Sequence, residues 1–182
     1  MAFIRGASKK DVPSRVVLES SKISNVDDML MFAESKGIQM EPLDLNEIVN
    51  ILGLKLTFEP LQNDVSGSLY KDKIDGYWRI KVNSLHHPNR QRFTIAHEVA
   101  HYILHRKDST EFNDSEFFRN SELNAMEKEA NSFASEVLMP REKFMAYIKN
   151  ISSKIEDIAS HFHVSAQAVQ LRAKSLGLAE RA

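Results

Sequence analysis

Residues 89–105 place apolar side chains at helical spacing, and within this stretch His97 and His101 stand four positions apart. On an α-helix, side chains at positions i and i+4 lie on the same face, so the two imidazoles can reach one point. Pro88 precedes the stretch and suits the first turn of a helix, where its missing N–H group is not needed. The segment therefore predicts a long helix that presents two potential metal ligands side by side.

The run His97-Glu98-Val99-Ala100-His101 is the H-E-x-x-H pattern of zinc hydrolases. In this pattern the histidines bind the ion, and the glutamate acts on a water molecule without binding. Catalytic zinc uses three protein ligands and leaves a fourth position open. We expect one Zn²⁺ ion, although another divalent metal such as manganese also suits two imidazoles and one carboxylate. The alternative interpretation is a helix with two surface histidines and a solvated glutamate.

The chain has no cysteine, so the third ligand must be a carboxylate or another histidine. A second predicted helix, residues 121–138, offers Glu127, Glu129 and Glu136. Glu127 shares a face with Asn131, whereas Glu129 points about 160° away from Glu127. We choose Glu127 as the ligand and Asn131 as the residue that orients a histidine ligand by a hydrogen bond. The other two glutamates are interpreted as part of a charged solvent face.

The remaining histidines are not expected to bind the ion. His105 lies about 12 Å along the helix axis from the first ligand histidine, so we interpret it as a helix-end or site-rim residue. His86 and His87 precede the helix and are expected to cap it or to line its approach. His161 and His163 are interpreted as surface or core residues.

Segments of alternating polarity between helices predict an α+β fold. The predicted helices before the site are residues 25–36, capped by Asn25, and 44–52, capped by Asp44. The predicted strands are residues 54–58, 66–70 and 77–82, with a hairpin connection at 71–76. We expect them to form a small antiparallel sheet packed on the active-site helix. The polar stretch 106–120 is expected to be a long loop.

Two predicted helices near the C-terminus, residues 155–162 and 166–175, resemble a helix-turn-helix unit. Their apolar residues, Leu171 included, are expected to face inward. If the unit binds DNA, the contacts would come from Gln167, Gln170 and Lys174. However, residues 141–182 hold seven Lys or Arg against four Asp or Glu, a net charge of +3 that is modest for a DNA-binding surface. A helical hairpin packed on the preceding domain is therefore the favoured interpretation.

Two blocks of sequence resemble the ImmA/IrrE family of metallo-endopeptidases, the M78 peptidases. They are RQRFTIAHEVAHYILH at 90–105 and EKEANSFASEVLMP at 127–140, preceded by the strand YWRIKVN. The resemblance covers residues 38–178 and implies a zincin-like domain. It implies that His97, His101 and Glu127 are the zinc ligands and that Glu98 is the general base.

The resemblance also implies a partner. Members of the family are often encoded by mobile elements or beside repressors with helix-turn-helix domains, and some cleave or inactivate those repressors. A helix-turn-helix repressor or an antitoxin is thus the expected protein substrate. We divide the chain into an N-terminal arm at 1–22, a zincin-like metallopeptidase domain at 23–150 and a C-terminal helical appendage at 151–182.

The expected activity is hydrolysis of a peptide bond in a specific protein, with a regulatory outcome. Zinc would polarise the scissile carbonyl, and Glu98 would take a proton from water and pass it to the leaving amine. The residue that stabilises the oxyanion is left open among Tyr70, Tyr77, Arg119 and His105.

Two other classes of function are kept as alternatives. One is a non-catalytic metal-containing module that grips a repressor or antitoxin, and the other is a DNA-binding regulator that uses residues 153–178. Glu98 favours catalysis, since a structural metal site needs no base. The net charge of −1 provides no global field for DNA or membranes. Because the sequence shows neither a signal peptide nor a membrane span, we expect a cytoplasmic protein.

Overall fold

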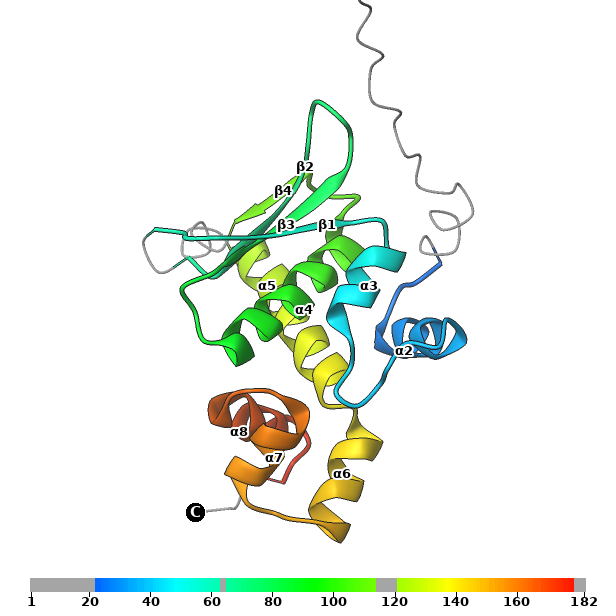
Figure 1. The fold of residues 1–182 in the computed structure, drawn as a ribbon, viewed down its shortest axis with the longest axis vertical. Coiled ribbons are helices and arrows are strands. Elements are labelled where there is room, and N and C mark those ends of the chain that lie inside the picture. The colour runs from blue at the N-terminus through cyan, green and yellow to red at the C-terminus, as the bar shows by residue number, and fades with distance from the viewer. Residues whose placement is uncertain (1–21, 63–64, 114–120, 179–182) are drawn as a thin grey trace, which may run out of the picture.

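The computed structural model describes residues 22–62, 65–113 and 121–178 (Figure 1). The helices are Val26–Ser35 (α2), Leu45–Ile51 (α3), Pro88–His105 (α4), Ser121–Leu138 (α5), Arg141–Asn150 (α6), Ile155–Phe162 (α7) and Ala166–Ser175 (α8). The strands are Lys55–Glu59 (β1), Gly67–Lys71 (β2), Trp78–Asn83 (β3) and Glu111–Asn113 (β4). The α+β class expected from the sequence is confirmed. Almost all of the expected N-terminal arm lies outside the described residues.

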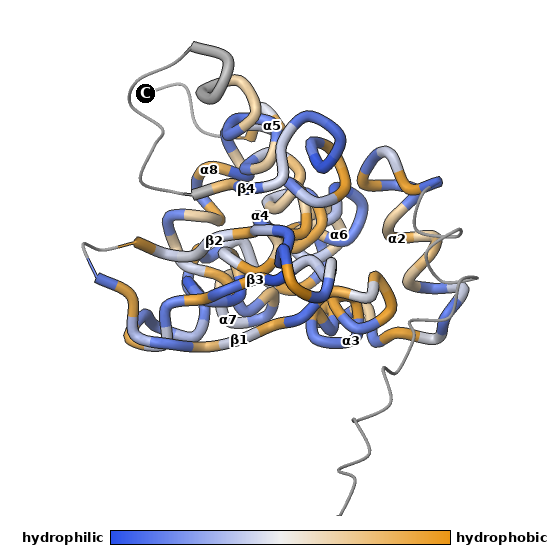
Figure 2. Tube along the Cα trace, turned by 90° about the horizontal axis from the view of Figure 1, so that it is seen from above, coloured by the Kyte–Doolittle hydropathy of each residue, from blue (hydrophilic) through white to orange (hydrophobic). Residues whose placement is uncertain are grey.

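The capping residues act locally, as the sequence analysis predicts. The Asn25 side chain accepts a hydrogen bond from the backbone N–H of Asp28, and Asp44 caps α3 in the same way. The His87 side chain caps α4, because its Nδ1 accepts from the backbone N–H of Asn89 at 3.2 Å. Hydrophobic and hydrophilic positions alternate along the peripheral helices α2 and α3, as expected for helices with one buried face (Figure 2).

The four strands form one sheet in the order β1-β3-β2-β4. β2 pairs antiparallel with both β3 and β4, but β1 pairs parallel with β3. The sheet is therefore mixed, and the expectation of a purely antiparallel sheet is wrong at β1. The alternation of apolar residues fixes which face of a strand is buried, but it does not encode the direction of the partner strand.

β4 lies within the segment that was expected to be a long loop. Its three residues are too few to show an alternating pattern. It pairs with β2, and its residue Phe112 has a side chain that is 6% exposed and stacks on the ring of His101. This short strand thus adds the segment after α4 to the edge of the sheet, next to the histidines.

Helix α4 is buried along most of its length. It lies between the sheet and α5, in the middle of the molecule (Figures 1 and 2). Every residue from Thr94 to Ile103 is buried, including His97, Glu98 and His101. Buried polar side chains are costly unless they have partners, so the polar residues of α4 must be paired within the protein or bind a ligand.

The C-terminal helices α7 and α8 share the hydrophobic core of the preceding elements. Arg172 of α8 donates from Nε to the backbone oxygen of Met139 at 3.0 Å, and Asn89 of α4 donates from Nδ2 to the backbone oxygen of Val164 at 2.8 Å. The two helices therefore form a hairpin packed on the body of the protein. Leu171 departs from the expected inward position, since it is 60% exposed.

The structure also bears on membrane association. Within residues 22–62, 65–113 and 121–178, no helix has both the length and the apolar character that are needed to cross a bilayer.

Candidate metal centre

Two helices bring three potential ligands together. His97 and His101 extend from α4 and Glu127 extends from α5. The Nε2 atoms of the two histidines are 3.0 Å apart, and Glu127 places one oxygen 3.2 Å from Nε2 of His97 and the other 2.6 Å from Nε2 of His101. One ligand atom from each of the three residues lies within 4.8 Å of the others. The structure thus joins the three residues that the sequence analysis selected as ligands.

Asn131 lies directly behind His97. Its side-chain oxygen is 3.1 Å from Nδ1 of His97. An amide oxygen accepts a hydrogen bond, so Nδ1 of His97 donates and the neutral imidazole keeps its lone pair on Nε2. Asn131 therefore lies where an orienting residue is expected, one helical turn after Glu127.

His101 has a longer chain of partners behind it. Its Nδ1 lies 3.1 Å from Nδ1 of His105, and Nε2 of His105 lies 3.1 Å from a carboxylate oxygen of Glu129. The ionised carboxylate only accepts, so His105 donates from Nε2 and accepts at Nδ1. His101 must then donate from Nδ1, which leaves the lone pair of its Nε2 directed toward Glu127.

This chain of contacts changes the interpretation of two residues. His105 is the last residue of α4, as expected for a helix-end residue, but it is only 4% exposed and does not lie at the rim of the site. Glu129 does face solvent, with a side chain 65% exposed, yet it also binds His105. Glu136 is half exposed and lies 3.6 Å from Arg172, so both glutamates have cationic or imidazole partners.

The donor set fits a divalent cation. With both Nδ1 atoms acting as donors, two imidazole nitrogens and a carboxylate carry lone pairs that face one another at 2.6–3.2 Å. Such groups repel one another unless a proton or a metal cation lies between them. Two imidazoles and one carboxylate are also a combination that zinc and other first-row divalent ions accept. His97, His101 and Glu127 would hold the ion.

The protonation states of Glu127 and His101 favour binding of a cation. Burial opposes ionisation of Glu127, but in the ion-free group the hydrogen bonds that His101 and His97 make when a proton lies on Nε2 outweigh burial and lower the pKa of Glu127 to about 2. Burial lowers the pKa of His101 below its usual value of 6.5. At neutral pH the carboxylate is therefore ionised and the His101 imidazole is neutral, which are the forms that bind a metal.

Glu98 is buried beside the ligands but does not belong to the group of three. Strand β2 passes very close to it at Gly67. A Cβ atom on Gly67 would lie 3.3 Å from Oε1 of Glu98, 2.7 Å from the backbone oxygen of Lys81 and 2.5 Å from Cγ2 of Thr94. Only glycine allows this approach without displacement of the neighbours, so Gly67 is part of what positions Glu98.

Phe112 forms one wall of the centre. Its ring stacks on the imidazole of His101 with a centroid distance of 4.8 Å and an interplanar angle of 20°. The ring lies on the buried side of the site and restricts rotation of the imidazole. Sequence reasoning missed this residue because its segment has no regular pattern.

Sequence reasoning also missed the contact between His101 and His105. Their spacing of four on a helix could have indicated it.

The candidates for oxyanion stabilisation are only partly resolved. His105 is committed to His101 and Glu129, so it does not face the space where a substrate would lie. The rings of Tyr70 and Tyr77 lie under lysine ammonium groups, 5.5 and 5.1 Å from their centroids. Arg119 lies outside the described residues.

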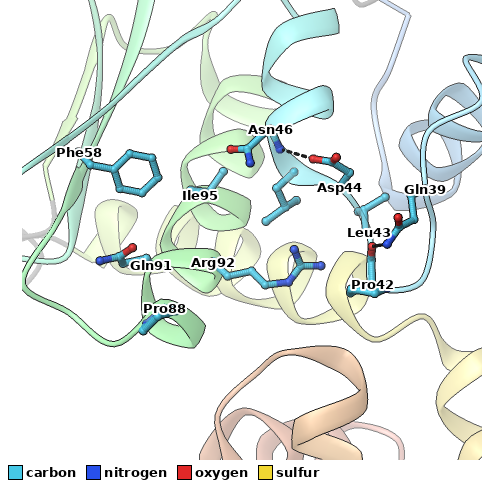
Figure 3. A pocket seen from close by; sticks show the side chains of 11 residues that line it. Gln39, Pro42, Leu43, Asp44, Asn46, Phe58, Pro88, Gln91, Arg92 and Ile95 are labelled. Atoms are coloured by element: carbon cyan, nitrogen blue, oxygen red, sulfur yellow. Dashed lines mark hydrogen bonds between the residues drawn. The ribbon is translucent and has the colours of Figure 1, made fainter.

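A cavity of about 220 Å³ opens onto the centre and is lined by His97, Glu127 and Asn131. A different cavity of about 310 Å³ lies between α3 and the start of α4 (Figure 3). The Arg92 side chain reaches into this second cavity, and burial lowers the pKa of its guanidinium group. His97, His101 and Glu127 do not line it, so it is separate from the candidate metal centre.

Comparison with known proteins identifies the chain as a metallopeptidase. More narrowly, the chain belongs to the ImmA/IrrE family, because the profile of the Peptidase_M78 family, the IrrE N-terminal-like domain, matches residues 49–174. Metallopeptidase ImmA of Bacillus subtilis (strain 168) is 31% identical over 164 residues, which cover 82% of this chain and 91% of the relative. The resemblance seen in the sequence is confirmed. A metallopeptidase implies a metal ion and a protein substrate.

A solved structure shares the fold. It is a Mycobacterium tuberculosis transcriptional regulator, with a TM-score of 0.55 and 17% identity over 88% of this chain. This chain spans 46% of the length of that regulator. At this level of identity the likeness concerns the fold alone.

Proposed function

We propose that the chain is a zinc-dependent endopeptidase of the H-E-x-x-H type, with His97, His101 and Glu127 as ligands and Glu98 as general base. The observation that carries this proposal is the convergence of three lone-pair donors within 4.8 Å, two of them with their other ring nitrogen already engaged. A structural zinc site closes all four positions with protein ligands, whereas three ligands leave one position for chemistry. Asn131 orients His97 in this proposal.

The protein side chains divide the work in the reaction. A bound zinc ion supplies Lewis acidity for attack on the scissile carbonyl. Glu98 accepts a proton from the attacking water and returns it to the leaving amine, and its burial favours this transfer of a proton in both directions. Asn131 and His105 hold the two imidazoles in place, so the ligands need no rearrangement during turnover.

We further propose that the substrate is a helix-turn-helix repressor or an antitoxin, and that cleavage has a regulatory outcome. Support comes from the family resemblance and from the similarity to metallopeptidase ImmA. The small volume of the cavity at the ligands favours a narrow choice of substrate. A module that binds its partner without cleaving it is the alternative.

The test uses the zinc-loaded protein and the purified product of the neighbouring gene. Fragments are sought by mass spectrometry with wild type, Glu98→Gln and Glu127→Gln. We expect cleavage by wild type alone, a full zinc content in Glu98→Gln and a reduced zinc content in Glu127→Gln. If Glu98→Gln keeps its zinc and still cleaves at the full rate, the proposed mechanism is wrong. Inactivation of the partner without fragments, unchanged in Glu98→Gln, would instead support the binding module.

A further inference from the structure

A groove runs from the metal centre to the C-terminal hairpin. The cavity at the ligands adjoins a larger one of about 770 Å³, and the two share Arg90, Phe93 and Asn131 as lining residues. The larger cavity has the size of pockets that hold a small organic ligand or a few residues of a peptide. The two cavities are therefore neighbours, and together they make up a groove that starts at His97 and Glu127.

Three helices build the larger part of this groove. The first turns of α4 and the middle of α5 form two sides, and α8 forms the third. α8 contributes Ala168 and the exposed side chain of Leu171, and α4 contributes Phe93 to the lining of the same cavity. The rest of the lining is polar, with two arginines, three amide side chains and four serine hydroxyls: Arg90, Arg172, Asn89, Asn131, Gln167, Ser132, Ser135, Ser165 and Ser175. The groove thus combines an apolar wall with small groups that can donate and accept hydrogen bonds.

The position of α8 is fixed. The bonds from Asn89 to the Val164 backbone and from Arg172 to the Met139 backbone tie the hairpin to α4 and to the end of α5. Arg172 is 5% exposed, so this second contact is in the interior. The wall that α8 forms is therefore held in place relative to the rest of the groove.

The cations of the groove are already engaged by the protein. Arg90 donates from Nη2 to the hydroxyl of Ser66, and Arg172 binds the Met139 backbone and lies near Glu136. Binding to nucleic acid depends on arginines and lysines that are available to phosphates. An extended polypeptide instead needs an apolar pocket for a side chain and hydrogen-bonding groups for its backbone. The groove offers these two features.

We propose that this groove binds a segment of the polypeptide substrate on one side of the scissile bond, with an apolar substrate side chain seated between Phe93 and Leu171. The C-terminal hairpin is then an element of substrate selection. This inference rests on the proposed function, because it takes the metal centre as the place of cleavage. The exposed side chain of Leu171 would be covered by the substrate in this arrangement.

The test anchors peptides at the metal by a hydroxamate group, which chelates zinc whatever the natural substrate is. Two libraries of random decapeptides are used, one with the hydroxamate at the C-terminus and one with it at the N-terminus, so that both sides of the scissile bond are sampled. Peptides that bind to the zinc-loaded protein are selected and sequenced. The variants are Leu171→Ser and, as a matched control, Ile151→Ser, since Ile151 is 69% exposed and does not line the groove.

We expect one library to show selection for an apolar residue at one fixed position. Leu171→Ser should reduce that selection about tenfold, because it removes burial of a leucine-sized apolar group, whereas Ile151→Ser should leave it unchanged. If wild type and Leu171→Ser select the apolar residue equally, or if neither library shows a selected position, the proposal that the groove binds substrate is wrong. The same holds if Leu171→Ser changes only salt-dependent binding of double-stranded DNA.

Acetohydroxamate, which has no peptide, separates this inference from the proposed function. We expect it to bind zinc-loaded wild type and Leu171→Ser equally. Binding of acetohydroxamate without selection among the peptides counts against the groove alone. If acetohydroxamate does not bind wild type, the proposed metal centre fails and the groove fails with it.

Discussion

Nδ1 of His105 lies 3.1 Å from Nδ1 of His101, so an imidazole that is itself too distant to reach the ion contacts one that is proposed to bind it. The carboxylate of Glu129 fixes which nitrogen of His105 carries the proton. The two residues together favour the tautomer of His101 that has a free lone pair on Nε2. Metal affinity should therefore depend on a glutamate that is largely exposed.

The first prediction concerns this chain of contacts. Glu129→Gln should weaken zinc binding about tenfold, because a glutamine side chain can donate as well as accept and no longer dictates the tautomer of His105. His105→Phe should weaken it further, up to about a hundredfold. Competition with a chromophoric chelator measures the affinity. Glu136→Gln is the control, and an equal affinity in all four proteins would refute the prediction.

The second prediction concerns the approach of β2 to α4. Gly67→Ala should destabilise the protein by about 1–3 kcal/mol, since the added methyl group meets Thr94 and the Lys81 backbone oxygen. It should also lower the cleavage rate by displacement of Glu98, while zinc content stays near that of wild type. Urea unfolding and metal analysis provide the measurements. Ser68→Ala on the same strand serves as the control, and a Gly67→Ala protein of unchanged stability would contradict the geometry.

The third prediction concerns the stability of the zinc-free protein at acid pH. Burial lowers the pKa of His101, so below pH 6.5 the unfolded chain binds a proton that the folded chain resists, and stability falls with the pH. The pKa of Glu127 is lowered from 4.5 to about 2, so its contribution is present above pH 4.5 and is lost as the pH falls toward 2.

Urea unfolding in the presence of a chelator, at a series of pH values from 7.5 downward, measures this dependence. Glu127→Gln should reduce the decline that occurs below pH 4.5, and the remaining decline comes from other carboxyl groups with lowered pKa values, such as those of Asp28 and Asp72. A stability that increases as the pH is lowered from 6.5 to 5 would contradict the direction of the His101 pKa shift.

The fourth prediction concerns the attachment of the hairpin. Arg172→Met should destabilise the packing of α8 by about 2–4 kcal/mol, since it removes the hydrogen bond to the Met139 backbone and leaves that buried oxygen without a partner. Hydrogen exchange of the α8 amides should accelerate before that of α4. Lys174→Met, at an exposed position of the same helix, should have little effect. Equal exchange rates in the two variants would count against the role of Arg172.

Much of the centre could be predicted from the sequence because its signals are local. The spacing of His97 and His101 and that of Glu127 and Asn131 both follow from the helical period, and the caps at Asn25 and Asp44 involve neighbours in the chain. What joins the two helices is not local. A helical pattern shows which residues share a face, but it does not show which face of the next helix they meet.

The features that were missed depend on such distant partners. Glu129 points away from Glu127 on an ideal helix, so only the position of α4 reveals its contact with His105. The parallel pairing of β1 depends on the path of the chain around β3. Leu171 matches the apolar pattern of its helix, and its exposure follows from the position of the groove.

The continuous burial of α4 from Thr94 to Ile103 has a consequence for how proteins of this kind diversify. A change at almost any position between Thr94 and Ile103 disturbs either the interior packing or the chemistry, so this helix offers little freedom for acquiring new targets. The exposed positions of α8 that line the groove, Gln167 and Leu171, can be substituted at little cost in stability. Duplicated copies of such an enzyme could therefore diverge in target through the hairpin alone while the catalytic helix stays the same.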